Sequence, residues 1–334
     1  MAAHTEPTVL LLTRSDVASL ISISACIDAM EEAFRTHANG GSFGIGMIHG
    51  ERDHVEWHLK SGGLELPTPV YALKANSASF LNPQRFGLPS IMGAILLFAA
   101  DRATLLAIMD STVITIQRTA AATAVAARAL ARADSCRVTV IGAGRQARAH
   151  VLALHEVFPA ASFVVSSRNP DHAVALAHEL STREGIPTRS DGDARTVCEG
   201  ADIIVTCTPA REPVLKSDWI QPGVFVAAVG ADSPDKNEIE PALFGRARVI
   251  TDITAQCAAV GDLHHAVDSG VMSVSDVHAT LGEVLAGTKP GRVSDQDIIL
   301  YDATGSAIQD AAATALVYEA ACSEGRGTSM ALWS

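Results

Sequence analysis

The sequence predicts an α/β protein made of a Rossmann-type domain with a parallel sheet and a second, discontinuous α+β domain. Three observations support this prediction. The turn Gly142-Ala143-Gly144 directly follows a short apolar run, further apolar runs alternate with helical stretches after it, and β-like runs broken by Gly and Pro precede it. We therefore expect residues 118–305 to form the Rossmann domain, and residues 1–117 together with 306–334 to form the other domain.

The N-terminal part opens with short elements. A strand is expected at Val9–Leu12, and the apolar spacing of residues 23–34 predicts a helix capped by Ser22 or Ser24. Gly40-Gly41 should end this helix. From residue 43 to residue 98, short β-like runs are interrupted by Gly and Pro, which predicts a mostly antiparallel sheet.

The second half of the chain has a different texture. An alanine-rich helix over 112–133 is expected to connect the two domains. A last helix over 306–321 should return to the first domain, because a chain that leaves a domain by one helix often comes back beside it. Between these helices, apolar runs alternate with helical stretches, which is typical of βα units around a parallel sheet. These runs lie at 138–141, 163–165, 203–205, 224–229 and 248–250.

Composition and charge exclude several classes of protein. The chain has 334 residues, of which 48% are hydrophobic and 19% charged, so it can fill the cores of two domains. Its formal net charge of -12 argues against a nucleic-acid partner, because proteins that bind a phosphate backbone carry basic stripes. We therefore expect no nucleic acid among its partners.

Membrane, secretion and metal signals are weak. The longest apolar stretch, residues 91–100, is about half of the ~20 residues that a membrane-spanning helix needs. The first residues lack the basic start and the cleavage site of a signal peptide, which predicts a cytoplasmic protein. The six cysteines form no CxxC pair, and no third ligand stands at a recognised spacing from His264-His265. We expect neither a disulfide framework nor a metal.

The glycine turn predicts a dinucleotide site. A GxGxxA pattern alone is weak, but here it follows the strand 137–141 and opens a helix over 145–157. Gly142 would permit the tight turn, Gly144 would let the backbone approach a pyrophosphate, and Ala147 would keep helix and strand close. The alternative is a strand-to-helix turn without a ligand.

The end of the second strand indicates which nicotinamide cofactor is used. An enzyme that uses NAD usually places an acid there, to bind the ribose 2'-hydroxyl. This chain has Ser167 and Arg168 instead, a pair that could accept a 2'-phosphate. The sequence therefore favours NADP(H), with NAD(H) as a possible cofactor. In the alternative interpretation, Arg168 stacks on adenine or faces water.

Two later turns should lie beside the nicotinamide. The segments 206–209 (Thr-Cys-Thr-Pro) and 229–232 (Val-Gly-Ala-Asp) follow apolar runs, so they should sit at the carboxyl ends of parallel strands, where ligands bind. The predicted cofactor-binding residues in these turns are Thr206, Thr208, Val229 and Gly230. Cys207 is expected to be a small wall residue, because no partnered base accompanies it.

These residues converge on a known family: the chain resembles the ornithine cyclodeaminase and mu-crystallin family, which includes an archaeal alanine dehydrogenase and ketimine reductases. The resemblance runs nearly end to end and implies a substrate-binding and dimerisation domain beside the Rossmann domain, and a homodimer. Its markers are Tyr71-Ala72-Leu73-Lys74, Gly87-Leu88-Pro89-Ser90, Gln117-Arg118-Thr119-Ala120-Ala121, the glycine turn, Gly230-Ala231-Asp232 with Lys236 and Glu238, the segment 276–283, and Tyr301-Asp302-Ala303-Thr304-Gly305.

The resemblance also implies roles for single residues. Lys74 and Arg118 would hold a substrate carboxylate, and Asp232 would exchange a proton at the amino-bearing carbon. Lys74 and Asp232 are thus the predicted catalytic residues. Fixed cations and a base are also what the chemistry of an α-amino or α-imino acid requires. Thr119 and Thr304, which lie in two of the markers, complete the cofactor-binding and substrate-binding sets. The residues implied to line the cofactor are Ser90, Arg118, Arg145, Gln146, Ser167 and Lys236.

Each role has an alternative. Lys74 could reach to the surface, Arg118 could pair with a surface acid, and Asp232 could only form a turn. The chain also departs from the cyclodeaminases, which carry an arginine in the segment matching 43–49 and an acid and a methionine where His58 and Lys60 stand here. Lys60 could supply the missing cation and suit a substrate with a second carboxylate; its alternative is a side chain in solvent. Ala303 replaces a serine near the cofactor.

Three functions remain open at this point. The first is an NAD(P)-dependent oxidoreductase of a small α-amino or α-imino acid, meaning an amino-acid dehydrogenase or a ketimine or imine reductase. The second is a lyase of the ornithine cyclodeaminase type, which releases ammonia without net change of the cofactor. The third is a non-enzymatic binding protein like some crystallins, against which the presence of Lys74, Arg118 and Asp232 argues.

Overall fold

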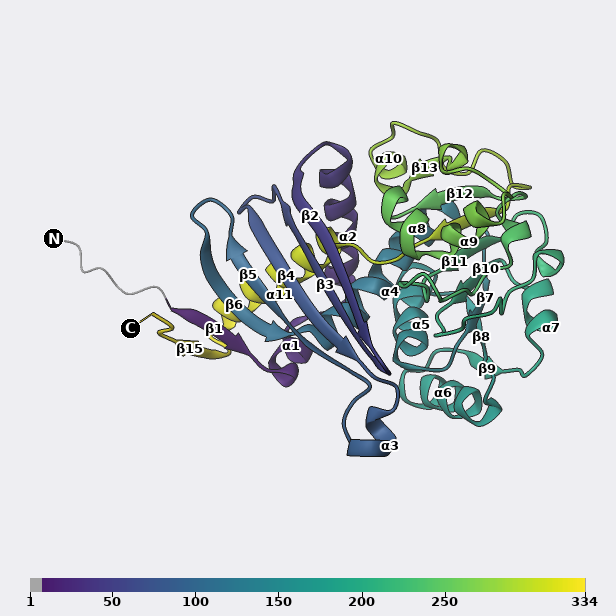
Figure 1. The fold of residues 1–334 in the computed structure, drawn as a ribbon. Helices are drawn as coiled ribbons and strands as arrows, with labels where there is room; N and C mark the ends of the chain where they lie inside the picture. The colour runs from purple at the N-terminus through teal and green to yellow at the C-terminus, as the bar shows by residue number, and fades with distance from the viewer. Residues whose placement is uncertain (1–7, 334) are drawn as a thin grey trace. The chain divides into compact units, whose positions relative to one another are not determined.

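The strands form two sheets, one in each of two units of the chain (Figure 1). The computed structural model describes residues 8–333. One unit consists of the described chain up to Arg118 and from Ser306 onward, and the other of Thr119–Gly305. The predicted α/β fold class, with a Rossmann-type parallel sheet and a second α+β part, is confirmed. Among the described residues, no helix is long and apolar enough to cross a membrane.

The first unit contains a seven-stranded sheet that is antiparallel except where β1 pairs with β6. This agrees with the predicted antiparallel texture of residues 43–98. Its strands, in spatial order, are β15 (Thr328–Met330), β1 (Val9–Leu12), β6 (Thr104–Asp110), β5 (Ile91–Ala99), β4 (Val70–Ala78), β3 (Val55–Leu64) and β2 (Ser42–Arg52). Its helices are α1 (Arg14–Leu20), α2 (Ile23–Ala38), α3 (Asn82–Phe86) and α11 (Ala307–Glu324).

Helix α11 packs across β3 and β4 and beside α2. The approach is close, because a Cβ on Gly62 of β3 would lie 2.9 Å from the Cβ of Ala307. Side chains alternate between the faces of a strand, so His58 and Lys60 share one buried face of β3 while Trp57 points to the other. Ser22 caps α2 by accepting a hydrogen bond from the N–H of Ala25, which decides between the two predicted caps.

The second unit contains an eight-stranded parallel sheet. In spatial order its strands are β13 (Ala279–Thr280), β12 (Arg248–Thr251), β14 (Ile299–Asp302), β11 (Phe225–Ala228), β10 (Ile203–Thr206), β7 (Arg137–Ile141), β8 (Ser162–Ser166) and β9 (Thr188–Ser190). Its helices are α5 (Arg145–Val157), α6 (Pro170–Arg183), α7 (Ala194–Glu199), α8 (Thr254–Val260), α9 (Asp262–Asp268) and α10 (Leu281–Leu285), and α4 (Ser111–Leu130) runs through the boundary between the units.

Three strands of this sheet were not predicted: β9, β13 and β14. The first two are short and lie at or near the edges of the sheet, where little apolar surface is buried. Strand β14 is fully buried between β11 and β12, but it follows a long loop instead of a helix, so it lacks the βα alternation used for prediction. Only the completed sheet shows that β14 belongs to it.

The order of the strands places the ligand-binding edge. Strand β7 lies between β8 and β10, and the chain moves out to β8 and β9 before it returns to β10 on the other side of β7. In open parallel sheets, ligands bind at the carboxyl ends of the strands where the order reverses. The carboxyl end of β7 is this position, and Gly142 follows it directly.

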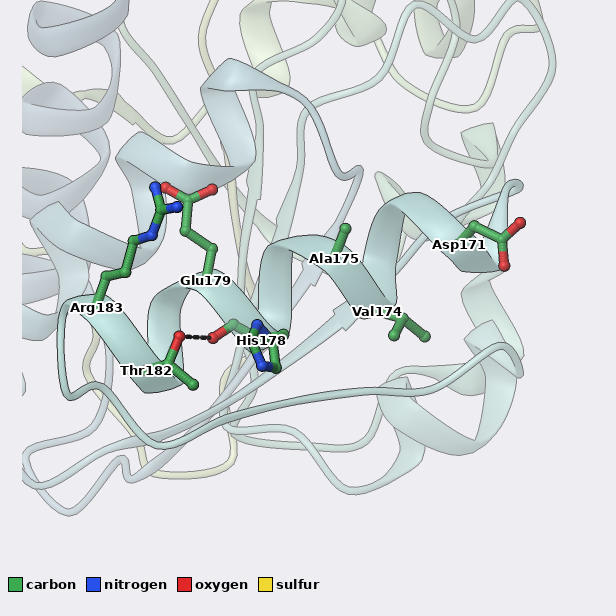
Figure 2. A pocket seen from close by; sticks show the side chains of 7 residues that line it. All are labelled: Asp171, Val174, Ala175, His178, Glu179, Thr182 and Arg183. Atoms are coloured by element: carbon green, nitrogen blue, oxygen red, sulfur yellow. Dashed lines mark hydrogen bonds between the residues drawn. The ribbon is translucent and has the colours of Figure 1, made fainter.

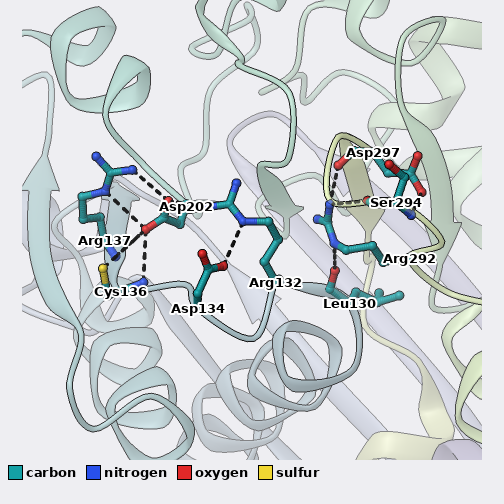
Figure 3. Close-up of polar contacts among 9 residues, drawn as sticks. All are labelled: Leu130, Arg132, Asp134, Cys136, Arg137, Asp202, Arg292, Ser294 and Asp297. Atoms are coloured by element: carbon teal, nitrogen blue, oxygen red, sulfur yellow. Dashed lines mark hydrogen bonds and ion pairs between the residues drawn. The ribbon is translucent and has the colours of Figure 1, made fainter.

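The opposite edge of the sheet is held by ion pairs (Figure 3). Asp202, just before β10, accepts hydrogen bonds from the guanidinium groups of Arg132 and Arg137 at 3.1 and 2.9 Å, and from the N–H groups of Cys136 and Arg137. Burial alone would raise the pKa of Asp202, but the bonds from Arg137 and the backbone lower it to about 2. Asp202 therefore ties the segment between α4 and β7 to β10.

Candidate active site

The glycine turn has the shape that a pyrophosphate requires. Gly142 has a φ of +129°, and a Cβ there would lie 2.9 Å from the sulfur of Cys207, so a larger residue would be both strained and obstructed. Gly144 is the N-cap of α5, and nothing lies within 4 Å of the position of its Cβ. Backbone amides at the start of this helix therefore border open space.

The polar groups beside this turn also fit a dinucleotide. Within residues 8–333, no side chain caps the N-terminus of α5, and the buried Oε1 atom of Gln146 has no hydrogen-bond partner. Both are groups that a bound anion and its sugar could satisfy. A nicotinamide dinucleotide therefore fits the residues present at the turn, and Gly144, Arg145 and Gln146 would hold its phosphates. Arg145 is exposed.

The end of β8 carries the residues that would meet the adenosine ribose. Ser167 is half-buried, and its Oγ accepts a hydrogen bond of 3.3 Å from the N–H of Asn169. Arg168 is exposed. The side chain of Asn169 caps α6 by accepting from the N–H of Asp171. The turn thus presents a hydroxyl and a guanidinium group, with no carboxylate between the end of β8 and the start of α6.

The turns after β10 and β11 are joined by the side chain of Glu238, one of the family markers, for which no role was predicted. The Thr206 hydroxyl and the N–H groups of Thr208 and Gly230 all donate to its carboxylate. Thr206 is fully buried, and the N–H of Val229 donates to its carbonyl oxygen. The four predicted residues Thr206, Thr208, Val229 and Gly230 are therefore brought together at one edge of the sheet.

Asp232 follows this turn and forms an ion pair with Lys236. The distance from Lys236 Nζ to Asp232 Oδ1 is 2.5 Å. The side chain of Asp232 is 40% exposed, whereas that of Lys236 is 12% exposed. An ionised carboxylate that is oriented by an ammonium group and open to solvent can accept or return a proton. Asp232 and Lys236, predicted as separate site residues, are thus direct partners.

The first unit carries a buried cluster of cations around one acid. Lys74 Nζ lies 2.6 Å from Asp310 Oδ2, and Arg118 Nε donates to Asp310 Oδ1 at 3.0 Å. Arg118 also donates to Gln309 Oε1 at 2.7 Å. Lys60 is buried and lies directly opposite Lys74 in the pairing of β3 with β4. The solvent-facing alternatives for Lys60, Lys74 and Arg118 are therefore wrong.

Sequence reasoning did not identify Gln309 and Asp310. The available signal was two adjacent polar side chains, one of them charged, at the start of the alanine-rich helix α11. Burial is the main influence on Lys74 and lowers its pKa to about 7, against the opposing attraction of Asp310. Burial would raise the pKa of Asp310, but Lys74 and Arg118 lower it on balance. Asp310 is thus the ionised partner that makes the cations tolerable in the interior.

His58 lies next to this cluster along β3. It is buried, its Nε2 is 3.1 Å from Glu56 Oε2, and its Nδ1 is 3.5 Å from the Nδ1 of His49. Because positions i and i+2 of a strand face the same way, His58 and Lys60 lie on the face that α11 covers. His58 is therefore polar and enclosed, as a substrate-binding residue would be.

The remaining predicted residues divide between the units. Ser90 and Arg118, both predicted to contact the cofactor, belong to the first unit, and the carbonyl of Ser90 accepts from the N–H of Ser79. Thr119 begins the second unit. Thr304, predicted to bind substrate, belongs to the second unit and accepts a hydrogen bond from Gln256 at 2.7 Å. Each unit therefore carries some of the predicted cofactor-binding residues and some of the predicted substrate-binding residues.

A hollow of about 540 Å³ lies along one face of α6 (Figure 2). All of its lining residues come from this helix, among them Val174, His178 and Arg183. None of the predicted site residues lines it. It is a surface feature of one helix and contributes nothing to the dinucleotide site.

The parallel sheet, the glycine turn at its point of reversal and the polar groups beside it are those of an oxidoreductase that uses a nicotinamide dinucleotide. The chain belongs to the ornithine cyclodeaminase/mu-crystallin family, whose model matches residues 8–325. It is 36% identical to the alanine dehydrogenase of Archaeoglobus fulgidus over 96% of this chain and 97% of that protein. The resemblance inferred from the motifs is therefore confirmed.

Solved structures agree with this assignment. An archaeal alanine dehydrogenase dimer with bound NAD superposes with a TM-score of 0.92, at 35% identity over 97% of this chain and 99% of that chain. The Δ1-pyrroline-2-carboxylate reductase of Thermococcus litoralis, in complex with NADH and L-proline, has a TM-score of 0.90 at 34% identity. It covers 96% of this chain and 99% of its own. Both of these proteins are named for redox reactions of amino or imino acids.

Proposed function

We propose that this protein catalyses NAD(P)-dependent oxidation or reduction at the α-carbon of a small α-amino or α-imino acid. The observation that carries the proposal is the buried cluster of the three cations Lys60, Lys74 and Arg118, in which Asp310 pairs with both Lys74 and Arg118. Buried cations are expensive to maintain, and an anionic ligand such as a carboxylate would stabilise three of them gathered in one place. The relatives named as alanine dehydrogenase and pyrroline-2-carboxylate reductase support the same class of substrate.

The roles of the residues follow from their chemistry. Arg118 offers planar donors that suit bidentate binding of the α-carboxylate, and Lys74 adds a point charge. When bound, the nicotinamide ring supplies or accepts the hydride at the α-carbon. Asp232 returns a proton to the substrate nitrogen in reduction and removes one in oxidation, while Lys236 keeps its carboxylate oriented.

A direct assay tests this function. The protein is incubated with NADH or NADPH and a panel of keto acids with ammonia or methylamine, cyclic imino acids and iminosuccinate, and absorbance of the reduced nicotinamide is followed. Net oxidation of the cofactor is expected with at least one imino acid. Release of ammonia from ornithine without net change in absorbance would instead establish a cyclodeaminase, and no turnover with any pair would contradict the proposal.

We propose that NADP(H) is the preferred cofactor. The support is local: the end of β8 presents Ser167 and the exposed Arg168, and no acid stands where a ribose 2'-hydroxyl would be bound. A guanidinium group pairs well with a phosphate, whereas it offers less to a neutral hydroxyl. Two solved relatives hold NAD or NADH, so the two cofactors need to be measured side by side.

Replacement of Arg168 by Ala is expected to reduce kcat/KM for NADPH about 10- to 100-fold, because one charge-assisted contact with the 2'-phosphate is lost. The value for NADH should change by less than about threefold, since NADH lacks that phosphate. Arg183, at the other end of α6, provides a matched control when changed to Ala. Equal losses for both cofactors would contradict this role of Arg168.

We further propose that Lys60 extends the carboxylate-binding cluster toward a second acidic group of the substrate. Its side chain is buried on the face of β3 that α11 covers, directly opposite Lys74. A substrate with two carboxylates would neutralise more of this positive charge than a diamine, which would be repelled. The preferred substrates are accordingly small dicarboxylic or short keto and imino acids.

Changing Lys60 to Met keeps the length of the side chain and removes its charge. The ratio of kcat/KM for a dicarboxylic imino acid to that for a monocarboxylic one is expected to fall about 10- to 100-fold, the worth of one charged hydrogen bond. Lys289→Met, at a lysine paired with Glu283 on the surface, is the control for loss of a charge. An unchanged ratio would rule out contact between Lys60 and a second carboxylate.

A homodimer is the proposed assembly. Trp57 and Leu59 lie on the face of the first sheet opposite α11, and together with Met92 they line an open hollow of about 270 Å³. Trp57 is 41% exposed. An exposed apolar sheet face of this kind is typical of a subunit interface, and a solved relative is described as a dimer. Sedimentation equilibrium should give twice the chain mass of 34.9 kDa; a monomer at micromolar concentration would contradict the proposal.

A further inference from the structure

The carboxylate of Glu238 joins the ends of two neighbouring strands of the parallel sheet. The Thr206 hydroxyl, at the end of β10, donates to Oε2 at 2.8 Å, and the N–H of Thr208 donates to Oε1 at 2.6 Å. The N–H of Gly230, just after β11, donates to Oε2 at 2.7 Å. One side chain therefore accepts three hydrogen bonds from two turns that are distant in sequence but adjacent in the sheet.

The packing around Glu238 is tight, above all against Gly230. Glu238 is fully buried. A Cβ on Gly230 would lie 2.5 Å from the carboxyl carbon of Glu238 and 2.3 Å from the carbonyl oxygen of Thr208. A glycine at position 230 is thus what lets the two turns and the carboxylate come into contact. Burial raises the pKa of Glu238, and the hydrogen bonds from Thr208, Thr206 and Gly230 oppose this effect.

Two further buried acids continue this hydrogen-bonded network, one at the backbone of Glu238 and one behind α9. Asp262 Oδ1, at the first residue of α9, accepts from the N–H groups of Glu238 and Ile239 at 2.6 and 2.9 Å. Asp302, at the end of β14, accepts in turn from the N–H of Leu263 at 2.9 Å. The carboxyl ends of β10, β11 and β14 are therefore linked through the side chains of Glu238, Asp262 and Asp302 and the backbone between them. A rotation of the Glu238 side chain would break its bonds to the two turns, whereas Asp262 holds the backbone of Glu238.

The loop that Glu238 closes carries the proton-exchanging residue. The bond from the N–H of Gly230 to the Glu238 side chain joins the two ends of the segment 230–238. Asp232 and Lys236 pair within this segment at 2.5 Å. Because this hydrogen bond closes the segment into a loop, it restricts where Asp232 can lie. Small displacements of a group that transfers a proton reduce its rate strongly.

We propose that Glu238 is a positioning residue for proton transfer: it clamps the turn 206–208 and closes the loop 230–238, and so holds Asp232 where it can reach the substrate nitrogen. This inference rests on the proposed function, which assigns the proton transfer to Asp232. Glu238 touches neither substrate nor cofactor in this role. It acts only through the backbone groups and the hydroxyl that it binds.

The variant Glu238→Gln tests the clamp with almost no change in shape. A carboxamide has one acceptor oxygen, so its NH₂ group must face at least one of the N–H groups of Thr208 and Gly230. We expect kcat for imine reduction to fall about 10- to 100-fold, with the cofactor dissociation constant within about threefold of wild type, because the glycine turn is not altered. Amide hydrogen exchange should accelerate in peptides covering 206–210 and 229–238, and nowhere else in the second unit.

Glu240→Gln is the matched control, since Glu240 lies two residues later and its side chain accepts a hydrogen bond from the N–H of Ser217, outside the two turns. It is expected to keep wild-type kcat.

Should Glu238→Gln fold poorly, Thr206→Val and Thr206→Ser form a second pair: the valine removes one donor and should lower kcat, and the serine should restore it. Unchanged kcat in both Glu238→Gln and Thr206→Val, or unchanged exchange in the two peptides, would overturn the proposal. Failure of the wild-type protein to reduce any imino acid would instead reject the proposed function, and the exchange experiment would still test the clamp.

Discussion

The variant Asp232→Asn is expected to lose turnover by about 10²- to 10⁴-fold while it still binds the nicotinamide cofactor, because general acid-base catalysis by one side chain is worth about that much. Asparagine has the same shape as aspartate, and its oxygen can still accept from Lys236, which lies 2.5 Å from the native carboxylate. Only the capacity to carry a proton is removed. The measurement is kcat for reduction of the best imino acid, together with cofactor affinity from fluorescence titration.

A control in the same loop separates proton transfer from a change in loop structure. Asp235 pairs with Arg211 and accepts from the Ser233 hydroxyl, and its side chain is 48% exposed. Asp235→Asn removes the same charge three residues away and is expected to retain kcat within about threefold. If Asp232→Asn turned over as fast as Asp235→Asn, Asp232 could not be the residue that exchanges the proton.

The second large effect is expected from Asp310→Ala. This change leaves Lys74 and Arg118 buried without their common counter-ion, and breaking a buried ion pair from one side lowers the free energy of unfolding by about 3–5 kcal/mol. The same change should disturb binding of the substrate carboxylate, because Asp310 holds both cations in place. Urea denaturation followed by circular dichroism measures the first effect, and KM for the imino acid measures the second.

Two other variants of helix α11 serve as references for the loss of stability in Asp310→Ala. Glu319→Ala alters an exposed acid in the same helix and should change the free energy of unfolding by less than about 0.5 kcal/mol. Asp310→Asn keeps one acceptor oxygen and should fall between the two, since Arg118 Nε can still donate to it. A value for Asp310→Ala as small as that for Glu319→Ala would mean that the cluster contributes nothing to stability.

Much of the fold was predictable because its signals are local. The turn 142–144 stands between an apolar strand and a helix in the sequence itself, and the structure has β7 and α5 in those places. The last helix was predicted at 306–321, and the structure has α11 at Ala307–Glu324. Strand β14 escaped prediction because neither its length nor its neighbours in sequence distinguish it; its burial between β11 and β12 arises only in the sheet.

The sequence likewise predicted several residues of the site but not the partners of these residues. Lys74, Arg118 and Asp232 were named from residue chemistry and from the resemblance, and their catalytic roles stay predictions for the experiments above. Their partners were not foreseen: Arg118 and Asp310 are 192 positions apart, and Thr206 and Glu238 are 32 apart. No periodicity or motif spacing records which buried acid will meet which cation or amide over such distances.

The sequence by itself determined the class of fold, the dinucleotide turn and the family, because each depends on residues that are neighbours along the chain. The tertiary structure alone decided that Lys60 and Lys74 face each other across β3 and β4, that Asp310 pairs with Lys74 and Arg118, and that Glu238 closes the loop of Asp232. The physical reason is that a buried charged or polar group is stable only beside a partner. Only the packed chain determines which residue lies within hydrogen-bonding distance of that group.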